Sequence, residues 1–95
     1  MNIRSTSIDR LFQAMQGLET IEDYYEFFED LCTIKELQDM AHRLDTAVLL
    51  DEGLNYQNIS KEVGVSTATI TRVSKCLNYG SGGYKKALER LKDNG

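Results

Sequence analysis

The segment from Thr67 to Lys75 carries short hydroxyl and basic side chains at helical spacing. At 100° per residue, one side of this segment presents Ala68, Thr71, Arg72 and Lys75, with Thr67 in the first turn. Small side chains allow close approach to a groove about 12 Å wide, hydroxyls can bond to base edges, and cations can bind phosphate or guanine. This combination predicts a helix that enters the major groove of DNA.

The other side of the same segment is apolar and must face a core. Two short helices, about 56–63 and 67–79, meet at a turn where Gly64 can adopt positive φ, with Ser60 as the small residue where the backbones approach. Ser66 is placed to cap the second helix. The residues expected to lock the pair together are Ile59, Val63, Val65, Ile70 and Val73.

This layout predicts a helix-turn-helix. An ordinary helical hairpin with a solvated polar face is the alternative interpretation. The β-branched run from Thr67 to Thr71 could also be a strand, but five residues without a partner strand make a poor sheet. The predicted DNA-contacting residues are Gln57, Ser66, Thr67, Ala68, Thr69, Thr71, Arg72 and Lys75.

Charge is distributed unevenly along the 95 residues. The net charge is −4, but residues 1–53 hold 12 acidic and 4 basic residues, whereas residues 54–95 hold 3 acidic and 7 basic residues. A basic half can bind phosphates while an acidic half faces elsewhere. The alternative is a chance asymmetry between two solvated faces.

Capping residues and glycines divide the rest of the chain into helices, which makes the expected fold all-α with six helices. Apolar residues recur at helical spacing from Ile8 to Met15, and Thr20 begins a second helix. Thr33 with Glu36 forms a capping box for a long helix that Gly53 should end. After the glycine-rich joint at 80–83, a last helix is expected from Tyr84 to about Lys92.

The sequence argues against enzymatic, metal-binding and membrane functions. The single histidine, His42, has no nucleophile near it in sequence, and no glycine-rich phosphate loop is present. Cys32 and Cys76 lack metal-ligand spacing and are expected to be small buried residues, and no cofactor is expected. Without an apolar run of roughly 18 residues or a signal peptide, the protein is expected to be soluble and cytoplasmic.

Several short stretches resemble the bacterial Trp repressor in order and nearly in spacing. They are 30–33, Arg43, Gly53 and 68–72, with one residue fewer between Gly53 and Ala68. A closer similarity, to the Trp-repressor-like proteins of the YerC/YecD group, rests on 27–33, 66–73 and 76–80. The resemblance covers about residues 8–92, nearly the whole chain.

This resemblance implies a single domain that forms an intertwined homodimer. Residues 8–53 and 84–92 would supply the dimerisation helices, and residues 54–79 the helix-turn-helix. The implied function is that of a sequence-specific transcriptional regulator, expected to be a repressor, in the bacterial cytoplasm and on the nucleoid when bound. A dimer with twofold symmetry is expected to bind a near-palindromic operator in double-stranded DNA.

The resemblance also implies a small-molecule pocket lined by Thr33, Arg43, Arg72 and Cys76. Two departures argue against tryptophan as the effector. Val73 stands where the repressor has glycine, so its side chain would fill space needed by an indole. Cys76 replaces a serine whose hydroxyl helps hold the ligand's amino group, and a thiol bonds more weakly.

A protein-interaction role is the competing interpretation. Acidic and aromatic residues alternate along 19–30 and could dock a basic partner protein. The same stripe also fits a dimer interface with a solvated outer face.

Overall fold

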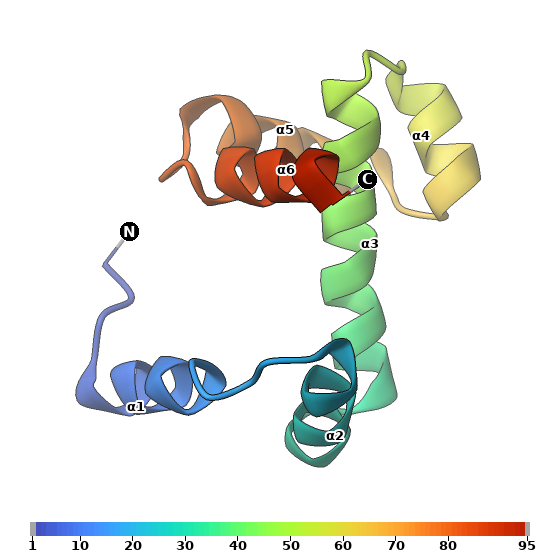
Figure 1. The fold of residues 1–95 in the computed structure, drawn as a ribbon. Helices are drawn as coiled ribbons and strands as arrows, with labels where there is room; N and C mark the ends of the chain where they lie inside the picture. Colours follow the sequence, from blue (N-terminus) through green and yellow to red (C-terminus); the bar gives the residue numbers. More distant parts are fainter. Residues whose placement is uncertain (1, 95) are drawn as a thin grey trace. The chain divides into compact units, whose positions relative to one another are not determined.

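The computed structural model describes residues 2–94. Within that range it contains six helices and no strand, which confirms the predicted all-α fold (Figure 1). The helices are α1 (Thr6–Met15), α2 (Ile21–Leu31), α3 (Ile34–Asp51), α4 (Tyr56–Val63), α5 (Thr67–Tyr79) and α6 (Gly83–Asn94). The chain divides into two compact units, and the boundary falls inside α3, between Leu37 and Gln38.

Reciprocal caps start two of the helices, as the sequence predicts. Thr20 Oγ1 accepts from the Asp23 N–H at 3.1 Å while the Asp23 carboxylate accepts from the Thr20 N–H at 3.1 Å. Thr33 and Glu36 make the same exchange at 2.9 and 3.1 Å. Hydrogen bonds from the backbone N–H groups of Glu19 and Thr20 lower the pKa of Asp23, and the N–H of Thr33 lowers that of Glu36. Both caps therefore weaken as pH falls through these lowered pKa values.

In the N-terminal unit, none of the described residues, 2–37, is buried. Along α1, the apolar stripe is only half-buried at Ile8, Leu11 and Met15, and Phe12 is 50% exposed. At the start of α2, Ile21 is 77% exposed. The amphipathic faces of these helices thus lack a covering layer within the unit.

The C-terminal unit contains the core. Figure 1 shows α4, α5 and α6 around the C-terminal part of α3. Gly53 ends α3 with a φ of 91°, as predicted. The buried residues come from all four helices and are Thr46, Ala47, Ile59, Ile70, Val73, Leu77 and Leu88.

The backbone of the glycine-rich connection between α5 and α6 is held in a defined conformation. The N–H of Gly80 closes α5 on the Cys76 carbonyl at 2.9 Å, and a Cβ at Gly80 would collide with that carbonyl oxygen. Gly82 has a φ of 89°, so the backbone reverses at a residue without a side chain. Helix α6 then begins at Gly83, one residue before the predicted start.

No helix within residues 2–94 is both long enough and apolar enough to cross a lipid bilayer.

Candidate nucleic-acid interface

Helix α4 is short because both of its ends are fixed by local hydrogen bonds. Asn55 Oδ1 accepts from the Asn58 N–H at 2.9 Å and caps the helix, a cap that the sequence analysis missed. At the other end, Gly64 adopts the left-handed conformation, with φ 81° and ψ 32°, and its N–H bonds to the Ser60 carbonyl at 2.9 Å. The predicted turn glycine is confirmed.

Helix α5 begins at Thr67, and its cap is the predicted one, Ser66, two residues after Gly64. Ser66 Oγ accepts from the Thr69 N–H at 3.2 Å and lies 3.2 Å from Thr69 Oγ1. Thr69 is half-buried, whereas Ser66 is exposed. The hydroxyl of Thr69 is thus engaged in the cap of α5, and the free N–H groups of the first turn lie beside it.

The two sides of α5 are as different as the sequence predicts. Ile70 has no exposed surface, and Val73 and Leu77 are also buried. The opposite side is exposed at every predicted position, namely Thr67, Ala68, Thr71, Arg72 and Lys75, and Gln57 of α4 is exposed as well. Thr71 Oγ1 donates its proton to the Thr67 carbonyl, one turn earlier, at 3.0 Å. The apolar side fixes the helix, and the polar side is presented outward.

Three of the four predicted pocket residues act electrostatically on Tyr84 of α6, which the sequence indicated only as the first residue of the last helix. Burial raises the pKa of the Tyr84 phenol, and the nearby Cys76 thiol acts in the same direction. Arg43 and Arg72 act on the same phenol and lower its pKa. Ionisable groups of α3 and α5 therefore act on the half-buried Tyr84 of α6, and these four residues are called the Tyr84 cluster.

Thr33, the fourth predicted pocket residue, belongs to the N-terminal unit. Its hydroxyl accepts from the Glu36 N–H in the α3 cap described above, and its side chain is exposed.

The prediction that both cysteines are buried is wrong for this chain. Cys76 is exposed, because the buried stripe of α5 runs through Val73 and Leu77 and leaves Cys76 about 100° away from Leu77. Cys32 is half-buried and lies just after the last residue of α2. Both are free thiols.

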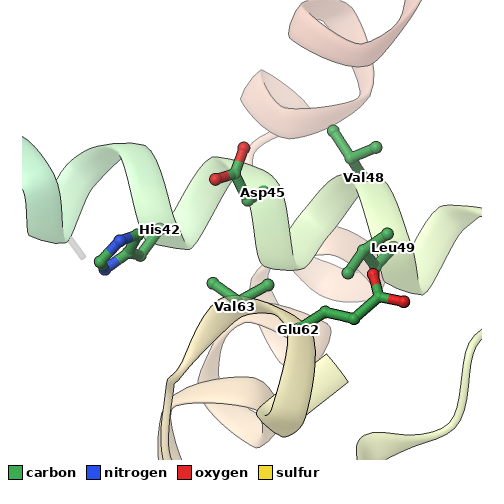
Figure 2. Close-up of a pocket in the computed structure, with 6 residues that line it drawn as sticks. All are labelled: His42, Asp45, Val48, Leu49, Glu62 and Val63. Carbon is green, nitrogen blue, oxygen red and sulfur yellow. The ribbon is translucent and has the colours of Figure 1, made fainter. Parts of the chain in front are cut away.

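Two cavities adjoin α3 in the C-terminal unit. The first, of about 340 Å³, lies between α3 and α4; Figure 2 shows Val63 pointing toward α3 and Glu62 extending beside Leu49. The second, of about 300 Å³, is lined by residues of α3 and of the turn, which are Asp39, His42, Arg43, Gly64, Val65, Ser66 and Thr69.

His42 lines both cavities but has no partner for nucleophilic catalysis there. The first cavity adds only the carboxylates Asp45 and Glu62 to it, and the hydroxyls in the second, Ser66 and Thr69, are engaged in capping α5. In the described part of the chain, no group of three His, Cys, Asp or Glu side chains could hold a metal ion.

Comparison with known proteins identifies the family. The sequence model of the family described as Trp repressor protein matches residues 6–92. This chain belongs to the Trp repressor family. Its members are transcription regulators rather than enzymes, which confirms the prediction of a non-enzymatic protein. The family binds DNA and forms dimers in general.

Individual relatives agree with this assignment. The uncharacterised protein YerC of Bacillus subtilis (strain 168) is 48% identical over 91 residues, which cover 96% of this chain and 88% of YerC. A Trp operon repressor homologue of Chlamydia caviae is 36% identical over 75 residues, covering 78% and 74% of the two chains. A crystal structure of a TrpR-like protein from Eubacterium eligens superposes with a TM-score of 0.90 at 41% identity, covering 95% of this chain and 93% of that one. The predicted family resemblance is confirmed.

The Tyr84 cluster can be tested by titrating the phenols. When phenolate absorbance is followed with rising pH, one tyrosine should ionise at a higher pH than an ordinary tyrosine, because the pKa of Tyr84 is raised. The stability that this neutral phenol contributes is present below the unfolded pKa and is lost as pH rises through the folded one. Tyr84→Phe should remove the late phase, whereas Tyr79→Phe, at a side chain 87% exposed, should leave it in place. A late phase that survives Tyr84→Phe would contradict the assignment.

Proposed function

We propose that this protein is a sequence-specific transcriptional repressor that binds double-stranded DNA as a homodimer and inserts α5 into the major groove. The observation that carries the proposal is the division of α5 into a buried apolar side and an exposed side of short hydroxyl and basic residues. The exposed side carries Thr67 and Thr71, and each threonine costs roughly half a kcal/mol in a helix relative to alanine, so a helix without a partner on this side has little reason to carry them. Facing DNA, the same residues gain partners.

The proposed contacts divide into those that read bases and those that hold phosphates. Thr67, Ala68 and Thr71 are short enough to let the backbone of α5 approach base edges. Lys75 and Arg72 supply positive charge, and the first turn of α5 offers N–H groups to a phosphate. Ser66 and Thr69 form the cap of that turn, and Gln57 lies in the first turn of α4; we propose that all three contact the DNA backbone rather than the bases.

The proposed partner of the apolar N-terminal helices is a second copy of the chain. No residue of α1 or α2 is buried within the chain, and the seven buried residues all belong to the C-terminal unit. A domain of this size needs further apolar burial for stability, and dimerisation provides it. The proposed arrangement is an intertwined dimer in which the acidic half forms the scaffold, so that two copies of α5 face successive major grooves of a near-palindromic operator.

The same surface bears on the competing role as a docking module. The rings of Phe27 and Phe28 meet edge to face, with centroids 5.6 Å apart, and both residues are half-buried within the N-terminal unit. These rings are therefore partly occupied by local packing, which favours a scaffold function for α2 over recruitment of a basic partner.

Tryptophan is not the proposed effector. Val73 is 3% exposed, so its side chain already fills the inner side of α5. Tyr84 is half-buried near Arg43 and Arg72, where it provides an aromatic ring from the chain itself. We therefore propose that this protein binds DNA without tryptophan.

DNA binding is tested by a salt series with matched variants. Binding should weaken steeply as salt rises, because each neutralised phosphate releases counterions. Thr71→Ala should reduce the preference for a selected operator over random duplex by about tenfold, the loss expected for one good base contact. Lys75→Ala should weaken binding to all sequences and reduce the salt slope by about 1.

Thr6→Ala, which removes an exposed threonine from α1, is the control and should behave as wild type. An affinity for DNA that does not change across the salt series would contradict the proposed DNA binding.

Dimerisation is tested by the mass of the free protein in solution. Sedimentation equilibrium should give twice the mass of the chain. Phe12→Glu places a charge in the apolar stripe of α1 and should weaken the dimer at least tenfold, because burying a phenylalanine contributes about 1.5–3 kcal/mol. Gln13→Glu adds the same charge beside that stripe and should leave the dimer intact. A monomeric wild-type protein, or equal effects of the two variants, would argue against this interface.

The effector proposal is tested by thermal unfolding. With millimolar tryptophan, the Tm should stay unchanged, because a ligand raises Tm only when it binds the folded state. The affinity for operator DNA should likewise be the same with and without tryptophan. A clear rise in Tm would show that Val73 and Tyr84 leave room for the ligand.

A further inference from the structure

We infer that Ser60 is a positioning residue of the DNA-reading head, because its hydroxyl ties α4 to the far side of the turn and so fixes the direction of α5. This inference rests on the proposed function of α5 in reading DNA. The sequence suggested only a steric reason for a small residue at this position. The structure adds a hydrogen bond that no other residue type of similar size makes equally well.

Ser60 is bonded to the turn at two points. Its carbonyl oxygen accepts from the Gly64 N–H at 2.9 Å, which ends α4. Its hydroxyl donates to the Val65 carbonyl oxygen at 2.7 Å, one residue before the cap of α5. Ser60 thus bonds to the N–H at the start and to the C=O at the end of the two-residue segment Gly64-Val65, and the hydroxyl bond has the short length of a good O–H···O interaction.

Within the turn, side-chain packing comes from Val65, which is half-buried. Gly64 has no side chain, and a Cβ built there would meet no atom within 4 Å. Gly64, Val65 and Ser66 also line the cavity of about 300 Å³ beside α3. With open space on that side, the conformation of the turn depends strongly on its hydrogen bonds. The bond from Ser60 is part-buried, so water competes for it less than at the surface.

A small change in the turn is enlarged along α5. The helix has 13 residues and rises about 1.5 Å per residue, so Thr71 and Lys75 lie several ångströms from the turn. A tilt of about 10° displaces an atom 10 Å away by nearly 2 Å, more than the range of good hydrogen-bond lengths. Base contacts should therefore suffer first. Phosphate contacts, which tolerate more variation in distance, should suffer less.

The test compares Ser60→Ala with Ser74→Ala. Ser74 is a matched control, because it is also a half-buried helical serine, but its oxygens accept from Asn78 within the same helix and do not connect α4 to α5. In Ser60→Ala, the ratio of operator affinity to random-duplex affinity should fall about five- to tenfold, with an unchanged salt slope on random duplex. Ser74→Ala should keep the ratio within about twofold.

An unchanged ratio in Ser60→Ala, even with a lowered Tm, would overturn the inference, because Ser60 would then be merely structural. Ser60→Cys guards against a variant that fails to fold. It keeps the shape of the side chain with a somewhat larger terminal atom and replaces a strong donor with a weak one, so it should lose specificity in the same direction. A cysteine variant with the full wild-type ratio would also overturn the inference.

A second measurement judges the Ser60 bond without DNA. Amide hydrogen exchange at Gly64 should accelerate in Ser60→Ala and stay unchanged in Ser74→Ala, because the Gly64 N–H is held in the turn that the hydroxyl closes. If wild type shows no operator preference while Gly64 exchange responds to Ser60→Ala, the proposed function fails and the bond stands. If Gly64 exchange does not respond, the inference fails whatever the DNA result.

Discussion

The crossing of α4 and α5 depends on two isoleucines that have no exposed surface. Ile59 comes from the middle of α4 and Ile70 from the first turn of α5, and both are fully buried with Ala47 of α3. Because buried side chains are close-packed, neither helix can rotate about its axis without opening a void. The outward direction of Thr71 and Lys75 is therefore set by what the inner side of α5 buries. The packing of the core thus determines which residues form the exposed side of α5.

That core is small, and it lies entirely within the C-terminal unit. Within residues 2–94, the seven buried residues all lie beyond the boundary inside α3, so the described part of the N-terminal unit has caps and amphipathic helices but no interior. Its reciprocal caps stabilise α2 and α3 locally, since each satisfies N–H groups that a helix leaves unpaired. Local capping cannot replace burial of apolar surface. A surface such as that of Phe12 and Ile21 is best explained as one side of an assembly.

The elements could be predicted from the sequence because the interactions that define them are local. Thr20, Thr33 and Ser66 each bond to a residue three positions further on, and Gly53 and Gly64 act through their own φ. The exposed side of α5 followed from helical periodicity alone. Features that depend on how separate helices meet were missed. Tyr84 lies eight residues from Cys76 and further from the two arginines that act on it, and Cys76 was expected to be buried because periodicity does not show where the covering layer ends. Ser60 falls between these cases, because the sequence predicted the need for a small side chain at this position but not the hydrogen bond that its hydroxyl makes.

The hydroxyl of Thr71 has a consequence for the kind of base it can select. Its proton is already donated to the Thr67 carbonyl, so toward the groove it offers only lone pairs and a methyl group. An acceptor of this kind pairs with an exocyclic amino group, which in the major groove belongs to adenine (N6) or cytosine (N4). Guanine presents only the acceptors O6 and N7 on its major-groove edge and so gives this lone pair no donor, whereas the Thr71 methyl group can still contact the C5-methyl of thymine. For the proposed contact of α5 with DNA, a hydrogen bond internal to the helix therefore disfavours guanine at the base that Thr71 faces.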